Sequence, residues 1–216
     1  AGVPQALGGT ALPFSYNRLQ ELEQHVAQHA HEIAAVVMEP TRSTEPEPGF
    51  LAGVREICNR CGAVLIFDEI SSGWRMHLGG VHLKYGIQPD IAVFAKAMSN
   101  GHPMSAVIGR RAVMDIAQTT FISSTYWTEA VGPTAALATI HKLQQIEIAA
   151  HTSHIGNLMR ETWQTLSERY GVPVKVSGHA ALLHLSFEHR QAAELGTLFT
   201  ARMLRQGFLA GSGFYP

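Results

Sequence analysis

The stretch GAVLIFDEISSGWR, residues 62–75, decides the fold class. The residues from Ala63 to Phe67 form an unbroken apolar run, which is typical of a strand buried on both faces of a parallel sheet. Two adjacent carboxylates, Asp68 and Glu69, follow this run directly. Because ligands of open α/β sheets bind beyond the carboxyl ends of the strands, we expect Asp68 to lie at a ligand site.

Two further apolar runs have the same form. Strands are expected at Ile33 to Glu39 and at Ile91 to Ala95, and the second is followed at once by Lys96. Connections of helical length separate all three runs, which predicts an α/β fold with a mostly parallel sheet and right-handed crossovers. The segment PMSAVIGR, residues 103–110, predicts one more strand, for which an antiparallel orientation is one option.

The remaining periodic segments define a second, smaller domain. Residues 172–187 alternate as a sheet strand does, whereas helical spacing is found at about residues 17–30, 50–61, 129–149 and 191–206. We therefore predict that residues 1–150 are part of a large α/β domain. Residues 151–216 are predicted to be part of a small C-terminal α+β domain.

Composition narrows the classes of function. The 216 residues are 46% hydrophobic and carry a formal net charge of -1, so the chain has enough apolar residues for a core but no basic surface for nucleic acid. No apolar stretch is long enough to span a bilayer, and the first residues do not form a secretory signal. We expect a cytoplasmic protein that acts on small molecules.

The cysteines and histidines do not predict a metal site. Cys58 and Cys61 fall near the end of an expected helix, where the helix dipole disfavours a thiolate, so we interpret them as small buried residues. His25 and His29 share one face of another expected helix, but no further ligand accompanies them. We therefore expect no bound metal.

Parallel strands bring Glu39, Asp68 and Lys96 to one edge of the sheet. Buried charges need partners, so Asp68 and Lys96 either form a structural ion pair or bind one ligand together. Pyridoxal 5'-phosphate (PLP) uses both groups, because its aldehyde needs a lysine and its ring nitrogen a carboxylate. The segment SSTYWTE, residues 123–129, offers hydroxyl groups for a phosphate before an expected helix.

An NTPase is the rival interpretation of the same strand. AVLIFDE, residues 63–69, also has the form of a Walker B strand, whose aspartate serves magnesium. That fold requires the phosphate loop GxxxxGK[ST], and none of the lysines in the chain lies in one.

Four segments carry a resemblance to a known family: AAVVMEP (34–40), GAVLIFDEISSGWR (62–75), GGVHLKYGIQPDIAVFAKAMSNGHPMSAVIGR (79–110) and SSTYWTE (123–129). They resemble class III PLP-dependent aminotransferases, most nearly the branch of glutamate-1-semialdehyde 2,1-aminomutase. The most specific parts are the pair at 68–69, followed by GWR, and the lysine 28 residues after Asp68 in FAKAMSNG. The resemblance implies a fold-type I PLP-dependent transferase, of which this chain lacks the N-terminal part and the extreme C-terminus.

The resemblance also implies roles for single residues. Lys96 matches the lysine that forms the Schiff base and shuttles the proton, and Asp68 matches the partner of the pyridinium nitrogen. Ile70 matches the aliphatic residue on one face of the ring. Thr125 matches the threonine that binds the cofactor phosphate of the neighbouring subunit in a homodimer. From the residues alone, Ile70 is equally a core residue and Thr125 a helix N-cap.

The activity implied is transfer of an amino group from an amino acid or amino-aldehyde donor to an oxo acceptor. Two alternatives stay open: an intramolecular aminomutase of the glutamate-1-semialdehyde type, and a non-catalytic scaffold that keeps the fold. The chain departs from the family after Thr125, where Tyr126 and Trp127 stand in place of the small residues of Gly-Gly-Asn-Pro or Ser-Gly-Asn-Pro. The activity is expected of the full-length dimer.

Overall fold

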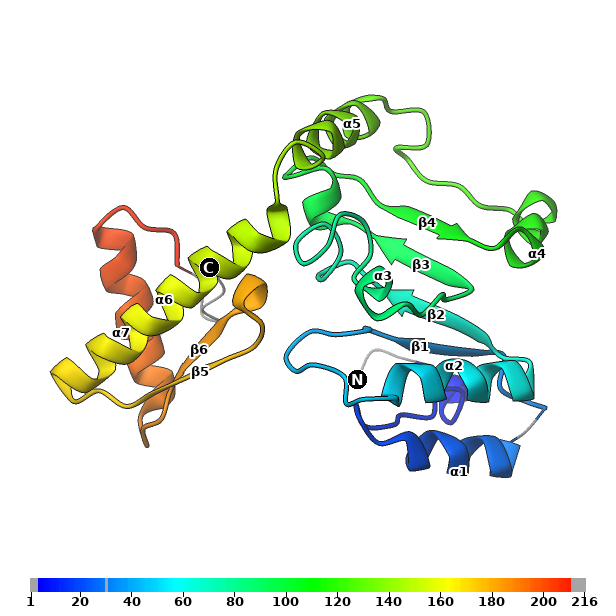
Figure 1. Cartoon of the computed structure of the whole chain (residues 1–216), viewed down its shortest axis with the longest axis horizontal. Coiled ribbons are helices and arrows are strands. Elements are labelled where there is room, and N and C mark those ends of the chain that lie inside the picture. The colour runs from blue at the N-terminus through cyan, green and yellow to red at the C-terminus, as the bar shows by residue number, and fades with distance from the viewer. Residues whose placement is uncertain (1–3, 30, 211–216) are drawn as a thin grey trace.

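A four-stranded sheet with the order β1-β2-β3-β4 lies at the centre of the larger of two lobes (Figure 1). The computed structural model describes residues 4–29 and 31–210. The strands are β1 (Ala35–Met38), β2 (Val64–Asp68), β3 (Ile91–Phe94) and β4 (Ala106–Gly109). The first three run parallel and β4 is antiparallel to β3. The predicted α/β fold with a mostly parallel sheet is thus confirmed.

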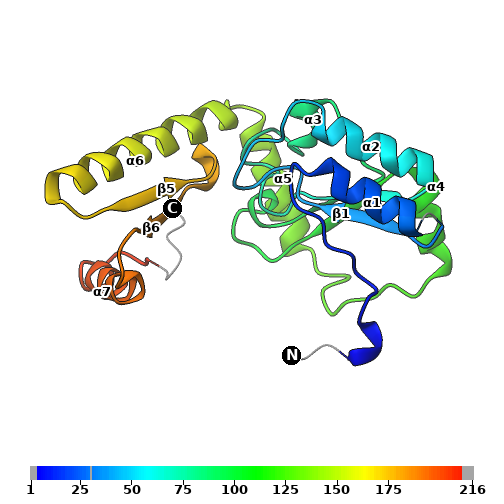
Figure 2. The same cartoon turned by 90° about the horizontal axis from the view of Figure 1, so that it is seen from below.

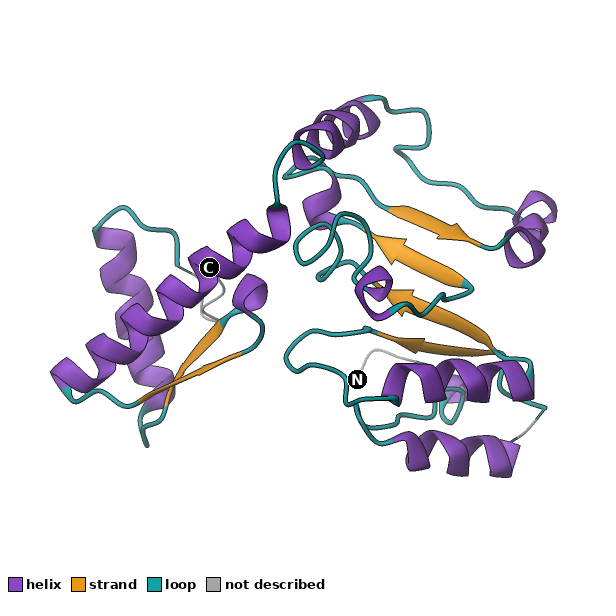
Figure 3. Cartoon of the chain, viewed as in Figure 1, coloured by secondary structure: helices purple, strands orange, loops and turns teal. Residues whose placement is uncertain are grey.

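Register places the ends of the parallel strands at one edge. Met38 pairs with Phe67, and Asp68 pairs with Val93 near the end of β3. Figure 3 shows that these carboxyl ends point toward the smaller lobe. Leu65 and Phe67 of the central strand β2 are fully buried on one face of the sheet, whereas Val64 and Ile66 on the other face are half-buried, so the burial expected on both faces is complete on one face only.

Two helices cover one face of the sheet. α1 (Leu19–His29) packs on α2 (Phe50–Cys61), and both lie over the sheet in Figure 2. Their apolar residues form the main core with β1 and β2, including Leu22, Val54 and Ile57. Gly62 ends α2 at φ 78° and donates its N–H to Cys58 O at 2.9 Å, a helix end for which glycine is suited.

The short elements and α5 complete the larger lobe. They are the 3-10 helices η1 (Gln5–Leu7), η2 (Lys96–Met98) and η3 (Asp115–Thr119), and the α-helices α3 (His82–Tyr85), α4 (Arg111–Met114) and α5 (Val131–Leu143). None of the described helices is long and apolar enough to cross a membrane.

The smaller lobe is a long helix on a hairpin. α6 (Ile148–Tyr170) carries the chain away from the larger sheet and lies across β5 (Val174–Ser177) and β6 (His184–Phe187), which pair antiparallel (Figure 1). The 3-10 helix η4 (Ala180–Leu182) joins the two strands, and α7 (Ala192–Arg205) follows. The domain boundary at residue 150 stays a prediction.

Two expected elements are wrong. The single helix expected at residues 129–149 is two helices, because Glu147 leaves the helical conformation between α5 and α6 (ψ 74°). The break lets α5 pack against η2 while α6 packs against η4. The single strand expected at residues 172–187 is a hairpin, because Gly178 turns the chain at φ 88°. The other predicted bounds differ from the observed ones by at most three residues at each end.

We predict that Gly156→Ala destabilises the fold. A Cβ at this position of α6 would lie 2.0 Å from the carbonyl oxygen of Ala180 in η4, so the helix must move off the hairpin. The free energy of unfolding should fall by about 1–3 kcal/mol, as measured by urea denaturation. Gly196→Ala in α7 is the matched control: a Cβ there meets nothing within 4 Å, and the change should stabilise by about 0.5–1 kcal/mol. Equal effects of the two changes would contradict this packing.

Candidate functional site

The three predicted charged groups, Glu39, Asp68 and Lys96, all lie at the carboxyl edge of the sheet, each with a different partner. Lys96 Nζ donates to Ser71 Oγ at 2.8 Å, and Asp68 Oδ1 accepts from the N–H of Ile70 at 2.9 Å. Glu39 accepts instead from Arg42 at 2.9 Å. Among the described residues no ion pair joins Asp68 to Lys96, so the structural pair considered from the sequence is not present.

The backbone at Lys96 is strained. Its φ of 49° lies in the left-handed region, which residues with a Cβ rarely adopt and which costs on the order of 1–3 kcal/mol. The preceding residue, Ala95, is extended, so the chain turns sharply between β3 and η2. Strain of this kind persists where the surrounding structure fixes a functional side chain.

Glu69 is the fully buried member of the pair at 68–69. Its carboxylate accepts four hydrogen bonds: from Ser72 Oγ at 2.6 Å, from Val81 N at 3.0 Å, and from the N–H and Nδ1 of His82, both at 2.8 Å. Burial acts to raise the pKa of Glu69, but the bonds from His82, Ser72 and Val81 outweigh it, so the pKa lies below its usual value.

Glu69 thereby shapes the loop that holds the candidate site. The bonds close residues 69–82 into a compact turn that begins directly after Asp68 and contains Ile70 and Ser71. Sequence reasoning noticed this glutamate only as the neighbour of Asp68 and assigned it no role. Its position directly after a buried strand could have indicated this role, because a carboxylate buried there needs several hydrogen-bond donors.

Two cavities open beside Lys96. One, of about 410 Å³, is lined by Arg42, Ser43, Ser71, Arg75, Lys96, Ser177, Gly178, Ala181, Leu182 and His184. The other, of about 820 Å³, reaches toward α5 and α6 and shares Arg75, Lys96 and Ala181 with the first. Both lobes contribute to each cavity, so the space beside Lys96 depends on how the lobes meet. Neither Asp68 nor Ile70 lines them; both are half-buried at the end of β2.

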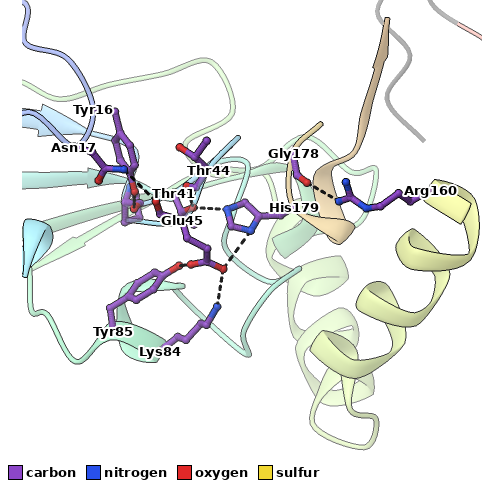
Figure 4. A network of polar contacts seen from close by, with 11 residues as sticks. Tyr16, Asn17, Thr41, Thr44, Glu45, Lys84, Tyr85, Arg160, Gly178 and His179 are labelled. Carbon is purple, nitrogen blue, oxygen red and sulfur yellow. Dashed lines mark hydrogen bonds and ion pairs between the residues drawn. The ribbon is translucent and has the colours of Figure 1, made fainter. Parts of the chain in front are cut away.

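A network of polar contacts joins the lobes at the smaller cavity (Figure 4). His179, next to the turn of the hairpin, places Nε2 2.5 Å from Thr41 Oγ1 and Nδ1 3.4 Å from Glu45 Oε1. Glu45 also accepts from Lys84 at 3.1 Å and from the hydroxyl of Tyr85. This network fixes the loop after β1, which supplies Arg42 and Ser43 to the cavity wall.

Thr125 lies apart from these groups. It is exposed and lines neither cavity, in a turn where the side chains of Phe121, Tyr126 and Trp127 are exposed as well. The alternative role as helix N-cap is wrong, because α5 begins only at Val131. Glu129 caps that helix instead, accepting from the N–H groups of Val131 and Gly132.

The cysteines and the paired histidines have structural surroundings. Burial raises the pKa of Cys58 to about 11, which suits a packed thiol rather than a nucleophile. His25 Nε2 lies 3.0 Å from Pro13 O, and His29 Nδ1 lies 3.1 Å from Glu32. Within residues 4–29 and 31–210, no group of three or more His, Cys, Asp or Glu side chains is placed to hold a metal ion.

Comparison with known proteins identifies the family. The sequence profile described as "Aminotransferase class-III" matches residues 13–213, and the chain therefore belongs to the class-III aminotransferases. The FumI protein of Sphingopyxis sp. MTA144, solved in its PLP internal aldimine form, superimposes with a TM-score of 0.90 at 25% identity, covering 100% of this chain and 53% of that one. The fold is thus that of the fold-type I PLP-dependent aminotransferases.

Two curated relatives give the range of activities in the family. The chain is 31% identical over 94% of its length to the 3-aminobutyryl-CoA aminotransferase of Cloacimonas acidaminovorans (strain Evry), covering 52% of that protein. It is 30% identical over 91% of its length to glutamate-1-semialdehyde 2,1-aminomutase 2 of Lachnoclostridium phytofermentans, covering 50% of it. The chain spans about half the length of these relatives.

We predict that Glu69→Gln destabilises the protein by about 3 kcal/mol at neutral pH. A glutamine carries an NH₂ group that must face donors at a site where every neighbour donates, and this leaves buried groups unpaired. Chemical denaturation measures the loss. Glu56→Gln is the matched control, because Glu56 is exposed and its one ion pair among the described residues is with Arg60, at 3.6 Å; the change should alter stability by less than about 0.5 kcal/mol.

A comparison of the parent protein with Glu69→Gln at several pH values tests the lowered pKa of Glu69. Since that pKa is lowered on folding, the carboxylate stabilises the protein above its usual pKa of 4.5, and the contribution is lost as pH falls from there through the folded-state value. The difference in stability between the parent and Glu69→Gln should therefore narrow in acid. A difference that stays constant down to pH 3 would contradict this.

Proposed function

We propose that the full-length protein is a PLP-dependent transaminase in which Lys96 carries the cofactor and Asp68 contacts its ring nitrogen. The observation that carries the proposal is the pair itself. A strained lysine and a half-buried carboxylate stand at the ends of adjacent parallel strands, and they are not bonded to each other.

The residues present fit the group chemically. Lys96 lines both cavities and offers a primary amine for an aldehyde. Asp68 uses Oδ1 for the N–H of Ile70, and no hydrogen bond to Oδ2 is found among the described residues, so that oxygen is available for a ring N–H. Ile70, two residues after Asp68, is half-buried and apolar, as a residue packing on a ring face would be.

Lys96, Ser71 and Asp68 have separate roles in the proposed reaction. PLP, when bound, supplies an electron sink for a carbanion next to the amino group. Lys96 removes and returns the proton at Nζ, and Ser71 Oγ, 2.8 Å away, positions that nitrogen. Asp68 keeps a proton on the ring nitrogen by its negative charge. Both lobes line the space beside Lys96.

We further propose a homodimer in which Thr125 binds the cofactor phosphate of the neighbouring subunit. Thr125 is exposed and lines neither cavity beside Lys96, and Phe121, Tyr126 and Trp127, which are close to it in the sequence, are exposed as well. Exposed aromatic clusters are typical of interfaces between proteins. The domain division at residue 150 belongs to the same proposal.

The aminomutase is the second candidate activity. It is supported by the relative from Lachnoclostridium phytofermentans and by a 44% identity over 118 residues to the glutamate-1-semialdehyde 2,1-aminomutase of Nitrosospira multiformis. Tyr126 and Trp127 count against the glutamate-1-semialdehyde assignment, because two bulky side chains after Thr125 change the shape of the substrate side. A scaffold role is disfavoured, because the chain carries both Lys96 and Asp68, and charged residues that a fold does not need for chemistry are often replaceable by apolar ones.

Mutation of Lys96 tests the proposal. The full-length protein mixed with PLP should show a visible absorption band, and borohydride should fix the cofactor covalently to Lys96. Lys96→Ala should lose the covalent adduct and lower the rate of amino transfer by at least about 100-fold. Lys175→Ala, at an exposed position of β5, is the matched control and should behave as the parent does. A folded parent without the band would contradict the proposal.

Asp68→Asn separates binding from chemistry. An asparagine keeps the shape of the side chain but not the charge that holds a proton on the ring nitrogen, so the covalent adduct should still form. The rate of amino transfer should fall by about 100-fold or more. Unchanged turnover would exclude the role proposed for Asp68.

A further inference from the structure

One histidine of the smaller lobe bridges to the larger lobe (Figure 4). His179, whose side chain is 10% exposed, places Nε2 2.5 Å from Thr41 Oγ1 and Nδ1 3.4 Å from Glu45 Oε1. Thr41 is fully buried, so the contact is shielded from water, where a hydrogen bond is stronger than at the surface. We call His179, Thr41 and Glu45 the latch.

The partners of His179 decide which ring nitrogen donates. The hydroxyl of Thr41 has one hydrogen, and it is donated to Thr44 O at 2.8 Å. Thr41 Oγ1 therefore accepts from His179, so Nε2 carries a proton. The contact of Nδ1 with Glu45 is longer and is an ion pair only when the ring is protonated. The bond from Nε2 to Thr41 is thus the one that the latch requires.

Each end of the latch belongs to a rigid part of its lobe. In the smaller lobe, Arg160 of α6 donates to Gly178 O at 2.8 Å, so the hairpin turn that carries the latch histidine moves with α6 (Figure 4). In the larger lobe, Asn17 donates from Nδ2 to Glu45 O at 3.2 Å and accepts at Oδ1 from Glu47 N at 2.9 Å. The latch therefore joins the two lobes and not two mobile loops.

The latch stands at one end of the space beside Lys96, and the chain crosses between the lobes at the other. The larger cavity is lined by Leu143 and Ile148, where the chain passes from α5 to α6 (Figure 1). The smaller cavity is lined by Arg42 and Gly178, which are neighbours in sequence of the latch residues. A smaller lobe that pivots at the crossing therefore opens the smaller cavity when the latch breaks.

We propose that His179 is a positioning residue that holds the smaller lobe closed over the space beside Lys96 by donating from Nε2 to Thr41. With the latch broken, the lobes separate at this end for a larger part of the time, and small solutes reach Lys96 faster. The inference rests on the proposed function only where its test uses the PLP-loaded protein, because the latch itself contains no group that the proposed chemistry needs.

Two substitutions of His179 separate the hydrogen bond from the shape of the ring. His179→Gln keeps an N–H donor near the place of Nε2, whereas His179→Phe keeps a ring without any donor. Backbone hydrogen exchange in the full-length protein then reports opening without a ligand. His179→Phe should speed exchange about 10-fold in residues 40–48 and 178–184, and His179→Gln should stay within about threefold of the parent. Exchange in β2 and β3 should be the same in all of these proteins.

The matched controls are His154→Phe and His154→Gln, at an exposed position of α6, and both should exchange as the parent does. If His179→Phe exchanges as the parent does, or if His179→Gln exchanges as fast as His179→Phe, the donor at Nε2 does not hold the lobes and the proposal is overturned. Should His179→Phe not fold, His179→Asn replaces it. Its amide takes the place of Nδ1 and does not reach Thr41, so exchange in it must also rise, and parent-like exchange overturns the proposal.

The PLP-loaded full-length protein gives a second readout, with borohydride as the probe of access to Lys96. The visible band should disappear about 10-fold faster in His179→Phe than in the parent and in His179→Gln. Equal rates in the parent and His179→Phe would mean that the latch does not cover the space beside Lys96, and only this inference fails. Absence of the band in the parent overturns the proposed function instead, and hydrogen exchange alone then decides whether His179 holds the lobes together.

Discussion

The site depends on one buried carboxylate. Glu69 is enclosed within the larger lobe and is held by four donors from residues 72, 81 and 82. Removing it from water is costly, and only the complete set of donors offsets that cost. The loop after β2 therefore has a single conformation in which the carboxylate is satisfied, and Asp68, Ser71 and Arg75 are fixed as a result.

The glycine pattern supports this view. A Cβ at Gly80 would lie 2.3 Å from His82 Nδ1 and 3.0 Å from Glu69 Oε1, so the turn has room for no side chain there. At Gly73 a Cβ would meet both the carbonyl of Glu69 and the ring of Phe94, each at 2.9 Å. The loop is packed as tightly as the core it covers, which explains how an irregular segment positions side chains.

The sequence predicted the sheet and its edge, because an unbroken apolar run such as Ala63 to Phe67 is typical of a strand in a parallel sheet and depends little on context. It did not predict the break between α5 and α6 or the hairpin at Gly178, where packing of the two lobes decides between a continuous and a broken element. The sequence placed Asp68 and Lys96 correctly at one edge of the sheet. The role of Glu69 was not predictable in this way, because its hydrogen-bond donors include residues twelve and thirteen positions further along the chain. The position of Arg75 in the cavity wall depends on both lobes. Such long-range pairings are not encoded in local patterns.

The left-handed backbone at Lys96 affects which substitutions the family tolerates at this position. At φ 49° a glycine fits without strain, so replacement of the lysine by glycine relieves the fold at the position where the chemistry is proposed. Folding and the proposed catalysis thus favour different residues at this position. A copy of the gene released from selection for activity is expected to drift away from lysine there, and a lysine retained at such a position is a record of continued use.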